Sequence, residues 1–279
     1  MPGADRAHRR SADLLDAYDR QLRGSLAHQT SPGVTVEVEG QIVRALMGEG
    51  QGMVTATGVS SLGESAAASL IRSQIAVFAT LHQPFEWKTW AHDHPHPFLQ
   101  LLLDFGFSSS DEESVLVARS SEVAEHRAQL PAGANLRQLR PGPDFRTLEE
   151  QLTQAFGEAH RDHAAAYEAA VIAFPDRVFL HGVLVDQRLA ATGRLELVDG
   201  SEFGTMWGGS VVPAWRHHGL YRALVSHRAQ LACGLGFPLL EVDALPTSRP
   251  TLERLGFLAL TSTTPFTWDP VASPLRAVR

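Results

Sequence analysis

Cysteine and lysine are almost absent from this sequence of 279 residues, which has one of each, Cys233 and Lys88. A single cysteine excludes a disulfide within the chain and is typical of a reducing compartment. No apolar run approaches the ~18 residues that a membrane helix needs, and the first residues carry charges where a secretory signal peptide is apolar. We therefore expect a cytoplasmic protein with no membrane partner.

Negative charge is missing from one part of the chain, although the formal net charge is −7. Residues 203–240 contain no Asp or Glu. The basic side chains of that window are Arg216, Arg222, Arg228, His217, His218 and His227. The overall negative charge argues against a nucleic-acid partner. A local basic region in an acidic chain instead suggests a site for one small anionic ligand.

Helix and strand patterns alternate along the chain, and 44% hydrophobic with 20% charged residues is typical of a globular fold. Residues 130–150 are rich in Pro and Gly and are interpreted as a junction between two domains, residues 1–135 and 136–279. The order of elements around "LDFGF" in the first half is similar to that around "LERLGF" in the second. The predicted fold class is α+β (mixed α/β), with two related domains, each a twisted mixed sheet flanked by helices.

Residues 210–236 predict a phosphate-binding corner, because a short apolar strand leads through a basic glycine turn into a helix. Backbone N–H groups in such a turn, with the free N–H groups and dipole of the helix start, attract phosphate oxygens. Gly219 lets the backbone approach closely, and Arg216 and Arg222 can pair with a diphosphate. The alternative is an ordinary strand–helix turn with basic surface residues.

At these residues the sequence resembles the GNAT superfamily of acyl-CoA-dependent N-acyltransferases, whose signature is Arg/Gln-x-x-Gly-x-Gly/Ala between the fourth strand and third helix. The signature reads Arg216-His217-His218-Gly219-Leu220-Tyr221 here, after "VVP". Downstream, "TLERLGF" at residues 251–257 looks like the family's closing segment "LYERLGF". The first half resembles the degenerate amino-terminal domain of tandem GNAT-like bacterial proteins, and it lacks the basic turn.

The resemblance implies acetyl-CoA as cosubstrate, bound where the fourth and fifth strands separate. A strand N–H then polarises the thioester carbonyl, and a primary amine of a small molecule or peptide attacks it directly, without an acyl-enzyme. The implied cofactor-binding residues are Ser210, Val211, Val212, Arg216, His217, His218, Gly219, Leu220, Tyr221 and Arg222.

The catalytic residues are less well marked. Many family members carry a Tyr before the "ER" of the closing segment, where it protonates the leaving thiolate, but this chain has Leu252. The candidate carboxylates are Glu196 on the third strand, Glu202 at the entry of the fourth and Asp243 on the fifth. Thr247 or Ser248 stands in place of a missing Asn. A second hypothesis therefore stays open: a catalytically inactive CoA-binding sensor or scaffold.

Three further expectations concern a possible metal site, the burial of Trp207 and the oligomeric state. His92, His94 and His96 alternate, but Pro95 and Pro97 favour a threefold polyproline path that separates them, so we expect a surface loop and no metal. Trp207 is expected in the core. The protein is expected to be a monomer or homodimer.

Overall fold

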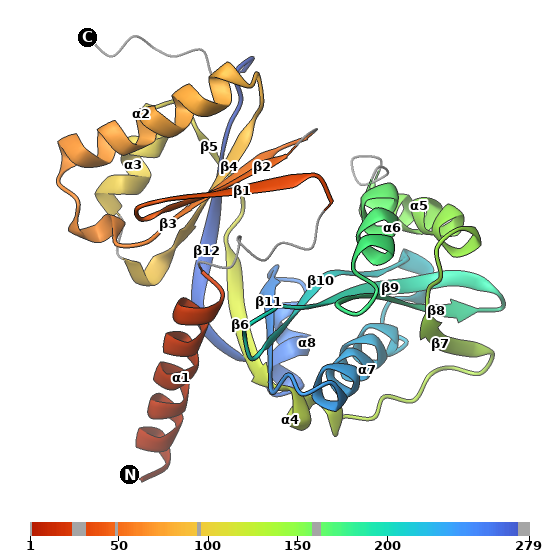
Figure 1. Ribbon diagram of the computed structural model, residues 1–279. Coiled ribbons are helices and arrows are strands. Elements are labelled where there is room, and N and C mark those ends of the chain that lie inside the picture. The colour runs from red at the N-terminus through yellow and green to blue at the C-terminus, as the bar shows by residue number, and fades with distance from the viewer. Residues whose placement is uncertain (1, 24–31, 48–49, 94–95, 158–162, 273–279) are drawn as a thin grey trace. The chain divides into compact units, whose positions relative to one another are not determined.

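The computed structural model describes residues 2–23, 32–47, 50–93, 96–157 and 163–272. The chain divides into two compact units (Figure 1), one of residues 1–29, 33–115 and 259–279 and one of residues 30–32 and 116–258. The expected boundary between residues 135 and 136 lies inside the second unit and stays a prediction about the extent of the domains. No helix within the described ranges is long and apolar enough to cross a membrane.

The first unit is built on a mixed sheet. Its strands, in spatial order, are β1 (Val34–Glu39), β2 (Ile42–Met47), β3 (Gly52–Ala56), β4 (Phe85–Trp90) and β12 (Leu258–Trp268), and β5 (Ser108–Ser109) pairs with β12. Only β3 and β4 run parallel; the other pairs are antiparallel. The helices are α1 (Pro2–Gln21), α2 (Glu64–Thr80) and α3 (His96–Asp104), with short 3₁₀ turns η2 (Val59–Ser61) and η3 (Ala91–Asp93).

Aromatic side chains make up much of the first unit's core. Phe85 stacks on Phe78 of α2 with 4.2 Å between ring centroids, and Trp87 meets Phe98 of α3 edge to face at 5.3 Å. Burial of side chains of this size is the main stabilising contribution. The two helices are thereby fixed against β4.

The second unit has the same kind of mixed sheet. Its strands, in spatial order, are β6 (Glu113–Arg119), β11 (Leu239–Ala244), β10 (Phe203–Val211), β9 (Arg188–Leu197), β8 (Val178–Val185) and β7 (Ala134–Gln138). The helices are α4 (Ser120–Ala124), α5 (Pro143–Phe156), α6 (His163–Ala173), α7 (Leu220–Gly234) and α8 (Arg249–Arg254). Helices α5 and α6 cover one face of β8 and β9, and α7 covers the other (Figure 1).

Local sequence explains several of these boundaries. Strands β8 and β9 form a hairpin through Asp186 and Gln187, which both have positive φ, 48° and 65°, as a tight hairpin turn requires. Pro213 opens the short 3₁₀ turn η5 (Pro213–Trp215) that ends β10, since proline cannot donate to a sheet.

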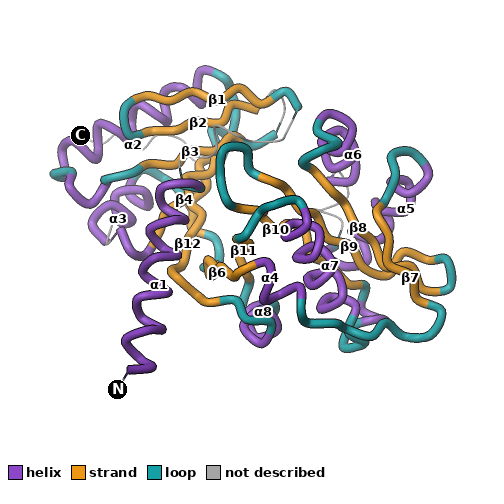
Figure 2. Tube along the Cα trace, turned by 60° about the horizontal axis from the view of Figure 1, so that its bottom comes forward, coloured by secondary structure: helices purple, strands orange, loops and turns teal. Residues whose placement is uncertain are grey.

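Each unit completes its sheet with a strand from the other half of the chain. Strand β12 belongs to the first unit from Ala259 onward and pairs with β4, from Thr263 opposite Trp90 to Trp268 opposite Phe85. Strand β6 belongs to the second unit from Leu116 onward. The order strand, 3₁₀ turn, helix, parallel strand, helix recurs in both units and can be followed in Figure 2.

Candidate functional site

Strands β10 and β11 separate soon after they start. They run parallel, but their pairing covers only Phe203 to Thr205 of β10 and ends at Glu241 of β11. Toward β9, the register of β10 shifts between Trp207 and Ser210, and Gly208 within this bulge has φ 57°. Because a bulge bends its strand, the second half of β10 runs on to Val211 with no β11 partner among the described residues.

The turn after β10 ends in a set of unused hydrogen-bond donors. Within the described chain, the backbone N–H groups of residues 217–222 donate to no acceptor, whereas those of Trp215 and Ala223 are paired. The first N–H groups of a helix have no intrahelical partner, and no side chain caps this end of α7. His217 and Gly219 add left-handed backbone, with φ 66° and 83°. Such an arrangement of amides and helix dipole attracts an anion.

The arginines of the turn differ in what they contact. Arg216 donates from Nε to the carbonyl oxygen of Val211 at 3.3 Å and from Nη2 to that of Ala155 at 3.2 Å. It therefore ties the turn to the end of α5, while other N–H groups of its five-donor guanidinium are left for a ligand. His218 donates from Nδ1 to the carbonyl oxygen of Arg216 at 2.8 Å. Arg222 is exposed on the first turn of α7.

Ser210 is held from the α5 side by a buried polar network. Its hydroxyl accepts from Gln151 Nε2 at 2.9 Å and lies 2.8 Å from Thr192 Oγ1, which donates to Gln151 Oε1 at 3.0 Å. All three side chains are buried. A buried polar network of this kind fixes the geometry of its members. Only the backbone of Ser210 is therefore left to meet a ligand.

Tyr221 occupies the last signature position, where the family has Gly or Ala. Its ring packs against Gly209 of β10, where an added Cβ would lie 2.8 Å from Cε2, and its hydroxyl is within hydrogen-bonding reach of Ser248. Ser248 Oγ also donates to the carbonyl oxygen of Leu245 at 3.1 Å. Burial raises the pKa of Tyr221, although the charge of Arg228 and the contact with Ser248 oppose this.

Tyr221 thus brings one predicted cofactor-binding residue and one predicted catalytic residue together at the start of α8. The family resemblance predicted only a cofactor-binding role for this tyrosine, not a proton-donating one. The sequence did contain a signal for such a role: the sixth position of the signature is Tyr221, where the family has Gly or Ala. Leu252, where the family carries its tyrosine, is fully buried in the core of the second unit.

Two of the candidate carboxylates lie on different strands. Glu196 on β9 is 2.9 Å from Arg194 Nε, and the Arg194 guanidinium stands over the Tyr167 ring at 4.5 Å. Asp243 is partly buried on β11, beyond Glu241, where the pairing with β10 has ended. Asp243 is therefore the candidate at the end of the sheet where β10 and β11 separate.

Two expectations about single side chains prove wrong. Trp207 is 37% exposed rather than in the core, and its Nε1 donates to Thr205 Oγ1 at 2.8 Å. It stands at the bulge, where the strand bends away from its neighbour. Arg228, counted with the basic ligand region, is fully buried and donates to the carbonyl oxygens of Arg194 at 2.9 Å and Leu224 at 3.2 Å.

Arg228 has an electrostatic effect on the core around it. Burial lowers the pKa of Arg228 to about 10. The guanidinium of Arg228 fits only because residue 193 is glycine; a Cβ on residue 193 would lie 2.7 Å from Cζ of Arg228. Burial first, and then the charges of His227 and Arg228, lower the pKa of His181 to about 3. Arg228 therefore supports the sheet and does not face a ligand.

Other predicted features lie in the first unit. His92 bonds from Nδ1 to Thr261 Oγ1 at 2.8 Å and faces Asp19 from Nε2 at 3.1 Å. His94 lies outside the described residues, as does the side chain of His96. The described residues contain no group of three or more His, Cys, Asp or Glu placed to hold a metal.

Comparison with known proteins identifies the fold. No protein-family model matches the chain, and no curated protein matches it. Among solved structures, a GCN5-related N-acetyltransferase from Kribbella flavida is similar over 94% of this chain and 95% of its own, with 14% identity and a TM-score of 0.66.

Two further solved structures agree. A tandem GNAT protein from the clavulanic acid biosynthesis pathway is 17% identical over 88% of this chain and 86% of its own, with a TM-score of 0.61. A GCN5-related N-acetyltransferase from Sphaerobacter thermophilus is 15% identical over 82% and 76%, with a TM-score of 0.60. The chain has a tandem GNAT fold, as the sequence resemblance predicted.

Proposed function

We propose that the second unit is an N-acetyltransferase domain that binds acetyl-CoA at the start of α7 and transfers the acetyl group to a primary amine. The observation that carries this proposal is the run of backbone N–H groups at residues 217–222, which have no acceptor in the described chain. An anion with several oxygens, such as a diphosphate, can satisfy several of them at once. The fold supports acyl transfer in general, and the acceptor is a small molecule or peptide.

The separated part of β10 supplies the next contacts. Beyond Thr205 the strand has lost β11 as a partner, so the backbone of Ser210 and Val211 can pair with the amide groups of the pantetheine arm. Val212 does not join them, because its N–H donates to the carbonyl oxygen of Ala190 and its own carbonyl oxygen accepts from Trp215. Ser210 contributes its backbone only, since its hydroxyl belongs to the network with Gln151. Arg216 and Arg222 add charge-assisted bonds to the phosphates.

The reaction needs no covalent enzyme intermediate. The neutral amine nitrogen attacks the thioester carbonyl carbon, an N–C bond forms, and the C–S bond then breaks to release the CoA thiolate. A β10 backbone N–H stabilises the oxyanion, and holding both reactants in place lowers the barrier further. Asp243, beyond the paired part of β11, takes the proton that the amine loses, directly or through water.

Tyr221 is the proposed proton donor to the thiolate. Burial keeps its phenol protonated, because desolvation raises its pKa. Ser248 orients the hydroxyl. This pair takes the place of the tyrosine that the family carries at the position of Leu252.

The experiment is a coupled measurement of coenzyme binding and thiol release. Calorimetric titration with CoA should show one site per chain, and acetyl-CoA should release free thiol when an amine is added. A panel of aminoglycosides, amino acids and peptides should contain at least one acceptor. If acetyl-CoA and CoA both fail to bind at millimolar concentration, the proposal is wrong.

The second candidate is a CoA-binding sensor or scaffold without catalysis. It is favoured by Leu252, because this buried leucine stands at the position where the family carries its proton-donating tyrosine. Coenzyme binding without thiol release on any amine would support this function over transfer.

A further inference from the structure

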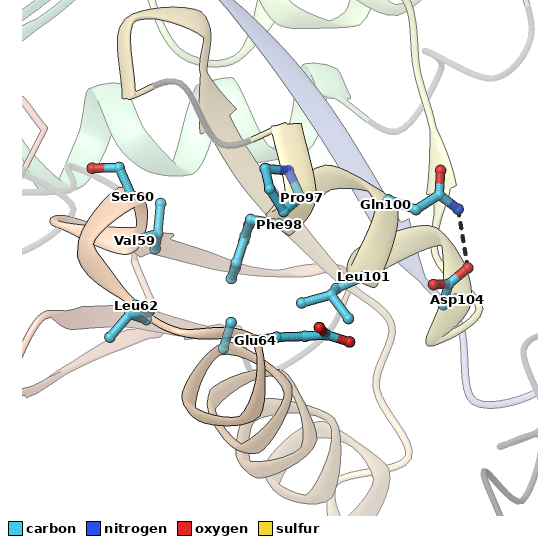
Figure 3. Close-up of a pocket in the computed structure, with 10 residues that line it drawn as sticks. Val59, Ser60, Leu62, Glu64, Pro97, Phe98, Gln100, Leu101 and Asp104 are labelled. Atoms are coloured by element: carbon cyan, nitrogen blue, oxygen red, sulfur yellow. Dashed lines mark hydrogen bonds between the residues drawn. The ribbon is translucent and has the colours of Figure 1, made fainter.

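The first unit contains a pocket at the counterpart of the second unit's coenzyme corner. In both units a strand leads through a 3₁₀ turn into a helix, and a second helix follows the parallel strand. In the first unit these elements are β3, η2, α2, β4 and α3. A cavity of about 480 Å³ lies between η2, the first turn of α2, and α3 (Figure 3). Cavities of this size hold small organic ligands.

Small side chains keep this corner open. In the second unit, Tyr221 in the first turn of α7 reaches across to Ser248 at the start of α8. The first turn of α2 carries Ser65, Ala66 and Ala67 instead, and Ala67 lines the cavity. No aromatic side chain therefore stands at the position in α2 that corresponds to Tyr221.

The lining combines an apolar wall with two carboxylates. The apolar members are Val59, Leu62, Ala67, Pro97, Phe98 and Leu101, and the acidic members are Glu64 and Asp104. In Figure 3 both carboxyl groups lie next to Leu101, and Ser60 lies at the other end of the lining. No basic side chain is among the described residues that line the cavity.

The two acids have different local roles. Glu64 begins α2, where a negative charge is favoured by the helix dipole, but Asp104 ends α3, where a negative charge is disfavoured. Among the described residues that line the cavity, its hydrogen-bond partner is Gln100, whose Nε2 donates at 3.0 Å. The dipole of α3 therefore does not account for Asp104.

We propose that this pocket binds an amphipathic ammonium ion, with the apolar part against Phe98 and Leu101 and the cation between Glu64 and Asp104. The corner of the second unit has free amides and arginines for an anion; this one presents the opposite charge. The two carboxylates repel a phosphate. An uncharged alcohol of the same shape contacts Phe98 and Leu101 but forms no ion pair with Glu64 or Asp104. The site binds its ligand without coenzyme and independently of the second unit's activity.

The test compares 2-phenylethylammonium with 2-phenylethanol on the full chain without coenzyme, by calorimetry and by backbone amide chemical shifts. The ammonium ion should bind about three- to tenfold more tightly, the range expected for one or two exposed ion pairs. Its shifts should centre on residues 59–67 and 97–104. Equal affinity for the two probes, or shifts centred elsewhere, would overturn the proposal.

Matched variants separate a local from a general charge effect. The double substitution E64Q/D104N should remove the preference for the ammonium ion. The double substitution D111N/E112Q neutralises two exposed acids that do not line the cavity and should preserve it. If both pairs reduce the preference equally, the protein's overall charge explains it and the pocket does not.

A variant of the second unit separates this inference from the proposed function. Gly219→Glu, which should abolish coenzyme binding, should leave the ammonium affinity unchanged. Loss of ammonium binding in that variant would place the probe in the second unit and contradict the proposal. Failure of the ammonium test leaves the coenzyme titration unaffected, because no coenzyme is present.

Discussion

The hydroxyl of Tyr221 lies close enough to Ser248 for that side chain to affect its pKa, so that the first turn of α7 comes near the start of α8. The ring reaches this position by packing on Gly209, which has no side chain in its way. This one side chain therefore links β10, α7 and the start of α8. In the proposed reaction it stands where β10 and β11 have separated.

Tyr221→Phe should lower kcat for thiol release by about 10- to 100-fold, the lower part of the range for general acid catalysis. Coenzyme affinity should change little, because the ring and its packing remain. Tyr167→Phe is the matched control, since that ring lies under Arg194 and has no proposed part in proton transfer. Equal kcat in the wild type and Tyr221→Phe would remove Tyr221 from the mechanism.

Gly219→Glu should abolish coenzyme binding, because it places bulk and negative charge beside the free amides. A residue with a side chain at φ 83° also costs about 1–2 kcal/mol of stability. Gly256→Glu is the control for that strain, since Gly256 has φ 94° and nothing within 4 Å of an added Cβ. Both variants should lose similar stability in denaturant unfolding, and only Gly219→Glu should lose CoA in calorimetry.

The stability of the protein should fall in acid because of His181. Its folded pKa is about 3, against an ordinary 6.5, so between these values the unfolded chain binds a proton that the folded chain does not. Stability therefore rises with pH across this window and falls as pH drops, by about 1.4 kcal/mol per pH unit at most. His181→Leu should flatten the pH dependence of urea unfolding between pH 4 and 6. An unchanged slope would contradict the assignment.

Trp268→Ala should destabilise the first unit by about 3–5 kcal/mol, because the side chain is fully buried in its core. This tryptophan comes from the last strand and pairs with Phe85 of β4. Trp207→Ala, at a side chain 37% exposed, should cost less than half as much. The comparison is made by chemical denaturation; similar losses would mean that β12 is not part of the first unit's core.

The strand, turn and helix of residues 210–234 could be predicted from the sequence because their signals are local. Pro213 ends a strand, Gly219 accepts a left-handed backbone, and the helix begins at once. The same reasoning placed Arg228 with the basic ligand region, but its side chain is in the core. Periodicity alone cannot show that Gly193 leaves room for a guanidinium.

Contacts between distant elements could not be predicted from the sequence, because the sequence signals act within single segments. The contact of Tyr221 with Ser248 depends on Gly209, and each residue comes from a different element. The pairing of β12 with β4 joins strands that lie more than 170 residues apart, from Thr263 opposite Trp90 to Trp268 opposite Phe85. No pattern within a single segment encodes such partners, so a boundary placed at residues 135 and 136 could not anticipate the exchange of strands.

The most direct test of the coenzyme site is to follow the backbone amide signals of the full chain as CoA is added. The account predicts that the amides of residues 217–222 shift most, because they gain phosphate acceptors that the described chain does not provide. Shifts confined to other residues, or none at millimolar CoA, would contradict it.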